Sequence, residues 1–170
     1  MKHKTLILAV LVLCGAAVFF FLGSRSATVK KDDRAPSFEV RDAVTGQPLS
    51  SSGLRDKVIF LNFWASWCEP CKEEMPSIDA LYREMAAHGN FVMVTVLYKD
   101  TPDNAFSYMN SKGYHFPVFL DPDGSVARAF GVTGVPETYI IDKSGVLVKR
   151  VIGGLDWSIP EEKSMIKAML

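Results

Sequence analysis

The chain has 170 residues, in which 19 Lys and Arg residues are balanced by 19 Asp and Glu residues. This length fits one domain with a full hydrophobic core and a short appendage. Because the formal net charge is zero, the composition argues against a nucleic-acid partner, which an excess of basic residues would favour. With three cysteines, of which Cys14 stands alone in an apolar stretch, the chain is not a small disulfide-stapled scaffold.

The N-terminal region predicts a membrane anchor. Residues 5–22 contain no charged side chain and follow a basic start. At about 1.5 Å per residue, a helix over this range spans about 27 Å, close to the hydrocarbon core of a bilayer. We expect a cytoplasmic start and transmembrane helix over residues 1–23, a polar tether over 24–35, and a domain over 36–170 on the periplasmic, extracytoplasmic side of the cytoplasmic membrane. A signal peptide is the alternative, although its apolar region is usually about 7–15 residues.

The domain alternates between strand and helix patterns. A strand over 36–40 and a turn near 45–48 predict an N-terminal hairpin. Apolar runs predict buried strands over 58–63 and 91–98, and an apolar repeat of three and four residues predicts a helix over 68–88. Further along, we expect helices near 101–113 and 125–130, strands over 116–120, 138–142 and 146–152, and a last helix capped by Ser158. This order predicts an α/β fold with parallel pairs and an antiparallel edge.

Two cysteines lie at the junction between the expected strand 58–63 and the helix that follows it. Cys68 and Cys71 are separated by two residues, which indicates a dithiol that opens and closes as a disulfide. The unpaired N–H groups of a helix N-terminus stabilise a thiolate at Cys68. We therefore expect Cys68 to attack a substrate disulfide and Cys71 to resolve the mixed disulfide.

The residues between the cysteines predict the direction of electron transfer. Glu69 places a negative charge beside the thiolate, and Pro70 has no N–H to donate to it. A less stabilised thiolate means a less stable reduced form and a more reducing couple. The pair is therefore expected to be a reductant.

A Cys-x-x-Cys pair also forms half of some metal sites. Structural zinc takes two further Cys or His ligands, but only His3, His88 and His115 are present and there is no second cysteine pair. We expect no metal and no cofactor. A copper metallochaperone that uses the two thiols as ligands is the alternative from a different class.

The motifs resemble a known family. Phe63–Lys72, which reads FWASWCEPCK, and Gly134–Thr138, which reads GVPET, resemble the thioredoxin superfamily and, more closely, its membrane-anchored TlpA/ResA/CcmG group of thiol-disulfide oxidoreductases. The similarity runs from about Ala35 to Gly154. It implies a thioredoxin fold, a central mixed sheet flanked by helices, with an N-terminal β-hairpin and a central αβ insertion, preceded by one transmembrane helix.

The resemblance also implies a substrate-binding surface. Pro136 matches the family's cis-proline, which packs against the dithiol, and Val135 offers its backbone groups to an extended substrate strand. Trp67 is expected to form an apolar platform beside Cys68, while Trp64 packs in the core. Glu137 is expected to face the substrate groove.

Glu74 matches a glutamate that ResA-like members place near the cysteines. Thioredoxins carry a buried aspartate in the first core strand as proton acceptor, and this chain has Asn62 there, which cannot titrate. Glu74 is therefore the expected proton acceptor for the resolving thiol. Its alternative is a solvated residue on the helix surface beside Glu73.

By resemblance, the chain reduces disulfides of specific proteins outside the cytoplasm. The expected substrate is the Cys-x-x-Cys-His haem-attachment site of apocytochrome c, during cytochrome c maturation. The expected electron donor is a membrane thiol relay protein. Another extracytoplasmic disulfide reductase or an oxidase are the alternatives within the same fold.

Overall fold

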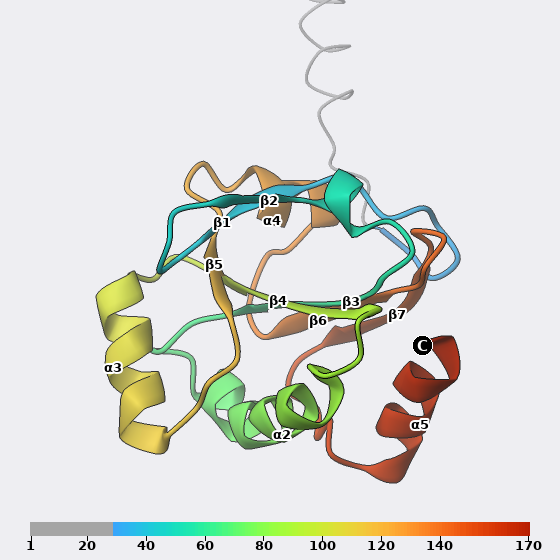
Figure 1. Cartoon of the computed structure of the whole chain (residues 1–170). Helices are drawn as coiled ribbons and strands as arrows, with labels where there is room; N and C mark the ends of the chain where they lie inside the picture. The colour runs from blue at the N-terminus through green and yellow to red at the C-terminus, as the bar shows by residue number, and fades with distance from the viewer. Residues whose placement is uncertain (1–28) are drawn as a thin grey trace, which may run out of the picture.

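The computed structural model describes residues 29–170 (Figure 1). In chain order its elements are β1 (Glu39–Asp42), β2 (Pro48–Ser50), the 3-10 helix η1 (Ser51–Leu54), β3 (Val58–Trp64), α2 (Glu69–Met85), β4 (Phe91–Leu97), α3 (Pro102–Lys112), β5 (Val118–Leu120), α4 (Ser125–Phe130), β6 (Glu137–Ile141), β7 (Leu147–Ile152) and α5 (Pro160–Met169). Across this described range, no helix has both the length and the apolar character needed to cross a bilayer. The predicted anchor over 1–23 lies outside the described residues.

The strands form one seven-stranded sheet in the order β2-β1-β5-β4-β3-β6-β7. β3, β4 and β5 pair in parallel, and the other neighbours are antiparallel. The α/β fold expected from the sequence, with its N-terminal hairpin and its closing hairpin, is therefore confirmed.

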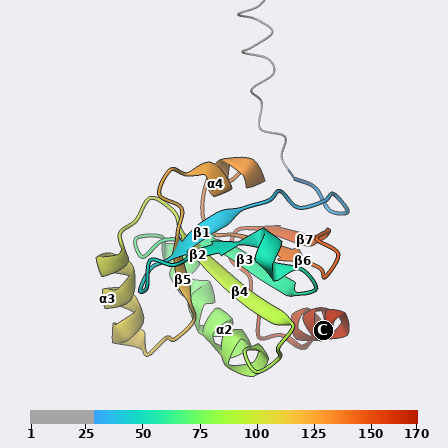
Figure 2. The ribbon, with the colours of Figure 1, turned by 45° about the horizontal axis from the view of Figure 1, so that its top comes forward.

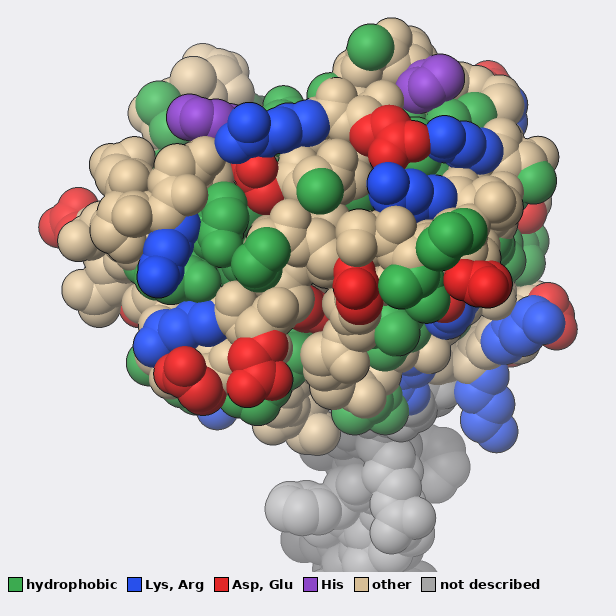
Figure 3. All heavy atoms as spheres, turned by 90° about the horizontal axis from the view of Figure 1, so that it is seen from below, with side chains coloured by type: hydrophobic (Ala, Val, Ile, Leu, Met, Phe, Trp, Pro, Cys, Tyr) green, Lys and Arg blue, Asp and Glu red, His purple; other side chains and the backbone are tan. Residues whose placement is uncertain are grey.

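Two hydrophobic layers enclose the sheet. α2, α3 and α5 contribute buried residues to one core cluster, and η1, α4 and the N-terminal segment contribute to the other (Figures 1 and 2). β3 lies between these layers, and all seven of its residues are buried. A strand buried on both faces needs a nearly continuous apolar sequence, which VIFLNFW provides except at Asn62. On the side of the molecule shown in Figure 3, acidic and basic side chains are mixed.

Several element boundaries differ from those expected by one to three residues, and two of the differences have a clear local cause. The first strand begins at Glu39 rather than at Pro36, because proline has no N–H to contribute to a ladder and Phe38 bonds instead to Ser51. The last helix begins at Pro160 and has Ile159, not Ser158, as its N-cap. The Ser158 hydroxyl donates to Asp156, so it does not cap the helix.

The segment before β1 lies against the domain. Val29 is buried, and Arg34 forms an antiparallel bridge with Val146. Asp32 N–H donates to Leu147 O at 2.8 Å. The described part of the expected tether therefore lies along the turn before the edge strand β7 and the first residue of that strand, Leu147.

The buried face of α2 allows a direct test of the core. Ile78 in α2 is 0% exposed, whereas Ile152 at the end of β7 is 74% exposed. We expect Ile78→Ala to lower the free energy of unfolding by about 2–5 kcal/mol, because it removes buried methyl groups and leaves a cavity. Ile152→Ala, the same chemical change at an exposed position, should cost less than about 1 kcal/mol. Urea unfolding of both variants measures the difference, and equal losses would contradict this packing.

Candidate active site

Cys68 and Cys71 form a disulfide at the N-terminus of α2. Cys68 is the N-cap residue of the helix, and Pro70 lies in its first turn. The Cys71 N–H points to Cys68 Sγ at 3.2 Å. Cys68 is 4% exposed and Cys71 is 0% exposed, so Cys68 is the cysteine that an incoming group reaches first.

The loop before β6 lies directly beside Cys68. The Val135–Pro136 peptide bond is cis, as the family resemblance implies for Pro136. The Val135 carbonyl oxygen lies 3.5 Å from Cys68 Sγ. The Pro136 carbonyl in turn accepts a hydrogen bond from Gly153 N–H at 2.9 Å. The sulfur that is reached first therefore faces a backbone carbonyl group of this loop.

Trp67 is held in an exposed position next to Cys68. Its residue exposure is 57%, yet its indole Nε1–H donates to Lys99 O at 3.1 Å. The preceding Ser66 N–H donates to Asp100 Oδ2 at 2.6 Å. Both bonds tie the turn before α2 to the β4–α3 connection, so an apolar ring is presented to solvent in a fixed orientation. Trp64, by contrast, is fully buried, as expected.

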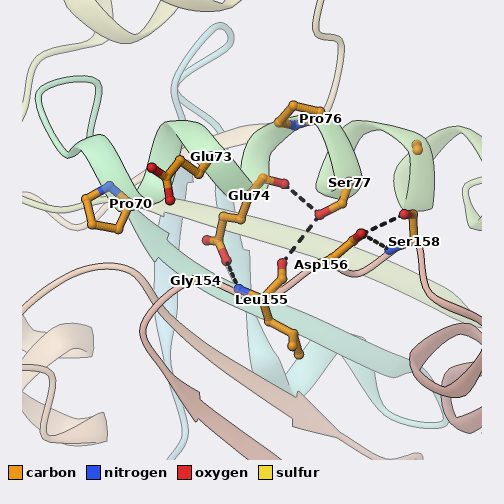
Figure 4. A pocket seen from close by; sticks show the side chains of 10 residues that line it. Pro70, Glu73, Glu74, Pro76, Ser77, Gly154, Leu155, Asp156 and Ser158 are labelled. Carbon is orange, nitrogen blue, oxygen red and sulfur yellow. Dashed lines mark hydrogen bonds between the residues drawn. The ribbon is translucent and has the colours of Figure 1, made fainter.

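Glu74 is buried beneath the first turns of α2, with 3% exposure. Asn62 Nδ2 donates to Glu74 Oε1 at 2.9 Å, and Leu155 N–H donates to Oε2 at 3.3 Å (Figure 4). Burial raises the pKa of Glu74 to about 7, against the lowering effect of these two hydrogen bonds. The alternative of a solvated surface residue is therefore wrong.

Asn62 connects this carboxyl group to the sheet. Its side-chain amide donates to Glu74 and also to Thr138 Oγ1 on β6, at 2.9 Å. Asn62 thus joins β3, α2 and β6 within the core. Asn62, which cannot titrate, therefore donates a hydrogen bond to the carboxyl group of Glu74, which can.

A cavity of about 470 Å³ opens between α2 and the loop after β7. Its lining residues are Pro70, Glu73, Glu74, Pro76, Ser77, Ala80, Gly154, Leu155, Asp156 and Ser158 (Figure 4). The charged members of this lining, Glu73, Glu74 and Asp156, are all acidic. The cavity thus combines apolar and acidic side chains beside the Cys-x-x-Cys turn.

Glu137 does not face the substrate groove, and that expectation is wrong. Glu137 is 2% exposed and forms an ion pair with Arg150 of β7. Tyr139 Oη also lies 2.7 Å from its Oε1, and burial with this carboxylate raises the pKa of Tyr139. The signal in the sequence was that both charged residues belong to the closing hairpin. There Arg150 lies opposite Tyr139 and reaches Glu137 diagonally across the two strands.

The negative charge of Glu69 is partly offset by the neighbouring Lys72. Its carboxylate lies 3.0 Å from Lys72 Nζ, and its side chain is 74% exposed. Solvent and the lysine both weaken its effect on a neighbouring thiolate. The absence of an N–H at Pro70 is thus the stronger of the two sequence arguments for a reducing couple.

Over residues 29–170, no group of three or more His, Cys, Asp and Glu side chains is arranged to hold a metal ion. His88 and His115 are both exposed. Residues 30–170 match the family model for Redoxin.

Named relatives agree with this match. The chain is 33% identical over 157 residues to the thiol-disulfide oxidoreductase ResA of Bacillus subtilis, covering 92% of this chain and 87% of the relative. It is 32% identical over 131 residues to the thiol:disulfide interchange protein HelX of Rhodobacter capsulatus, covering 76% of this chain and 72% of HelX.

A solved structure agrees as well. A thiol:disulfide interchange protein of the thioredoxin family from Chlorobium tepidum aligns with a TM-score of 0.67 and 28% identity, over 82% of this chain and 97% of that one. The chain therefore belongs to the Redoxin family within the thioredoxin superfamily, among its TlpA/ResA/CcmG-like thiol-disulfide oxidoreductases.

Proposed function

We propose that the chain reduces disulfides of specific partner proteins outside the cytoplasm through Cys68 and Cys71. The observation that carries this proposal is the disulfide at the N-terminus of α2, placed against the cis-Pro136 loop and beside the exposed Trp67. Such a site accepts an extended protein segment rather than a small molecule, because backbone groups and an apolar ring surround the reactive sulfur.

The proposed reaction begins from the reduced pair. The Cys68 thiolate attacks one sulfur of the substrate disulfide, forming a mixed disulfide and releasing the other substrate sulfur as a thiolate. Cys71 then gives up its proton and attacks Cys68 Sγ. This forms the Cys68–Cys71 disulfide and releases the first substrate sulfur, so two electrons pass from the pair to the substrate.

Glu74 is the proposed acceptor for the Cys71 proton. It lies one helical turn after Cys71 on the same helix, and its pKa of about 7 suits a base at neutral pH. The side chain is buried, so a proton moved to it stays out of bulk water. Above pH 7 it is ionised and ready to accept, and below pH 7 it is already protonated.

The proposed substrate is the haem-attachment site of apocytochrome c, with a membrane thiol relay protein as electron donor. The resemblance to the ResA and CcmG proteins supports this pairing. The acidic cavity beside the disulfide also suits a histidine or another basic side chain next to the substrate cysteines. The proposed location is the outer face of the cytoplasmic membrane, with residues 5–22 as the anchor.

A trapping experiment identifies the partner. Cys71→Ala removes the resolving thiol, so the mixed disulfide on Cys68 should accumulate in cells and be recovered by non-reducing gels and mass spectrometry. Cys68→Ala is the matched control and should trap nothing. Recovery of a c-type cytochrome precursor is the expected result. Tight stoichiometric copper binding with no mixed disulfide would instead favour the metallochaperone alternative.

The midpoint potential distinguishes a reductase from an oxidase. We expect a value below about −200 mV, on the thioredoxin side of the range that oxidoreductases cover. Equilibration with glutathione measures it. Because Lys72 offsets Glu69, the variant Glu69→Gln should raise the potential by less than about 30 mV. A wild-type value near about −120 mV, typical of strong thiol oxidants, would overturn the proposed direction.

Glu74→Gln tests the proton acceptor. In the wild type, the rate of thiol-disulfide exchange should rise between about pH 6 and pH 8 as Glu74 becomes ionised. Gln cannot accept a proton, so the variant should lose the part of this rise that Glu74 contributes and react about 10- to 100-fold more slowly at neutral pH. The dependence of thiolate attack itself on pH should remain. Stopped-flow Trp fluorescence follows the rate. Glu73→Gln, at the exposed neighbouring position, is the control, and unchanged rates in Glu74→Gln would remove Glu74 from the mechanism.

A further inference from the structure

The loop Gly153–Trp157, which we call the strap, connects three parts of the active site. Gly153 N–H donates to the carbonyl of cis-Pro136 at 2.9 Å. At Gly154 the backbone passes so close to the Cys-x-x-Cys turn that a Cβ atom would lie 3.1 Å from Pro70 O. Leu155 N–H donates to Glu74 Oε2 at 3.3 Å. The strap thus contacts the substrate loop, the disulfide turn and the buried carboxyl group in succession.

Ser77 fastens the strap to α2. Its side chain is buried, and its hydroxyl lies 2.7 Å from Glu74 O and 3.4 Å from Leu155 O. Since a hydroxyl has one proton, the shorter contact, to Glu74 O, takes it. The same oxygen accepts a hydrogen bond from Trp157 N–H at 3.0 Å. Figure 4 shows Ser77 between the Glu74 backbone and the strap.

The strap needs this attachment because it begins with two glycines. Gly153 has φ +91°, a left-handed conformation that glycine adopts without strain. Glycine also leaves the unbonded chain with more freedom than any other residue. The bonds made further along the strap therefore decide where Leu155 N–H points.

The electrostatics around Glu74 make this N–H important. Glu73 on α2 and Asp156 on the strap line the same cavity, Cys71 lies one turn earlier on α2, and none of these groups is cationic. Asn62 of β3 donates to Glu74 and is itself bonded to Thr138 of β6, and the Trp157 side chain also lowers the pKa of Glu74. Stabilisation of the carboxylate thus comes from neutral N–H donors, and Leu155 is one of them.

We propose that Ser77 is a positioning residue for Glu74: its hydroxyl fixes the strap on α2, and the strap then presents Leu155 N–H to the carboxylate. The inference deepens the proposed function and rests on it for its effect on the reaction. The positioning itself is measured on Glu74 directly, so the two can fail separately.

The test is the titration of Glu74 in the oxidised full-length protein, in which Cys68 and Cys71 cannot titrate. Carboxyl carbon NMR follows it. Ser77→Ala should shift the midpoint upward by about 0.5 to 1 pH unit, because the carboxylate loses a well-placed donor. Ser164→Ala, at an exposed position of α5, is the control and should leave the midpoint unchanged. Ser77→Thr and Ser77→Val provide a second comparison of equal shape, in which only the hydroxyl-bearing Thr should retain the wild-type midpoint.

The exchange rate provides the second readout. The rising limb of the rate against pH should move upward with the midpoint in Ser77→Ala, and Ser77→Ala should have no further effect in a Glu74→Gln background. An unchanged Glu74 midpoint in both Ser77→Ala and Ser77→Val would overturn the positioning role. A shifted midpoint with an unchanged rate profile would uphold the positioning and overturn Glu74 as proton acceptor.

Discussion

The burial of β3 is the constraint on which the active site depends. All seven of its residues lie inside the molecule, and a shift of one residue would exchange the side chains that face the two layers. The register is therefore fixed, and with it the point at which the strand ends and α2 begins. The same register pairs Phe63 with Glu137, which brings Pro136 to the end of β3. Cys68 and Pro136 are far apart in sequence, and they lie close together because the register of β3 is fixed.

A buried carboxyl group is the second consequence of this arrangement. Burying a charge without a partner is costly, and Glu74 is given hydrogen bonds from Asn62 and Leu155 rather than a cation. This partial compensation leaves its pKa near neutrality. Glu137 is buried to a similar extent, but it forms an ion pair with Arg150 that joins β6 to β7. Two glutamates of similar burial therefore differ in role because only one has a cationic partner.

Local patterns were enough to predict most of the fold and the reactive pair. Apolar runs identified β3 and β4, and the Cys-x-x-Cys spacing located the disulfide, since both depend on neighbours in the sequence. The cis state of Pro136 and the place of Glu74 came from family resemblance, because they depend on contacts across the sheet. Neither local patterns nor resemblance predicted the Arg150 ion pair or the Ser77 bonds to the strap. The ion pair lies diagonally across a hairpin whose register had not been predicted, and the Ser77 bonds join residues that are brought together only by the finished fold.

The bridge between Arg34 and Val146 has a consequence for how molecules meet one another. β7 is the outermost strand of the sheet, and an open strand edge invites a strand from another chain. The segment before β1 pairs with the start of that edge, at Val146 and Leu147. The opposite edge, β2, is only three residues long and begins with a proline, which cannot donate to a ladder. The β2 border thus offers little room for intermolecular pairing, and at the β7 border an incoming strand would have to pair beyond Leu147.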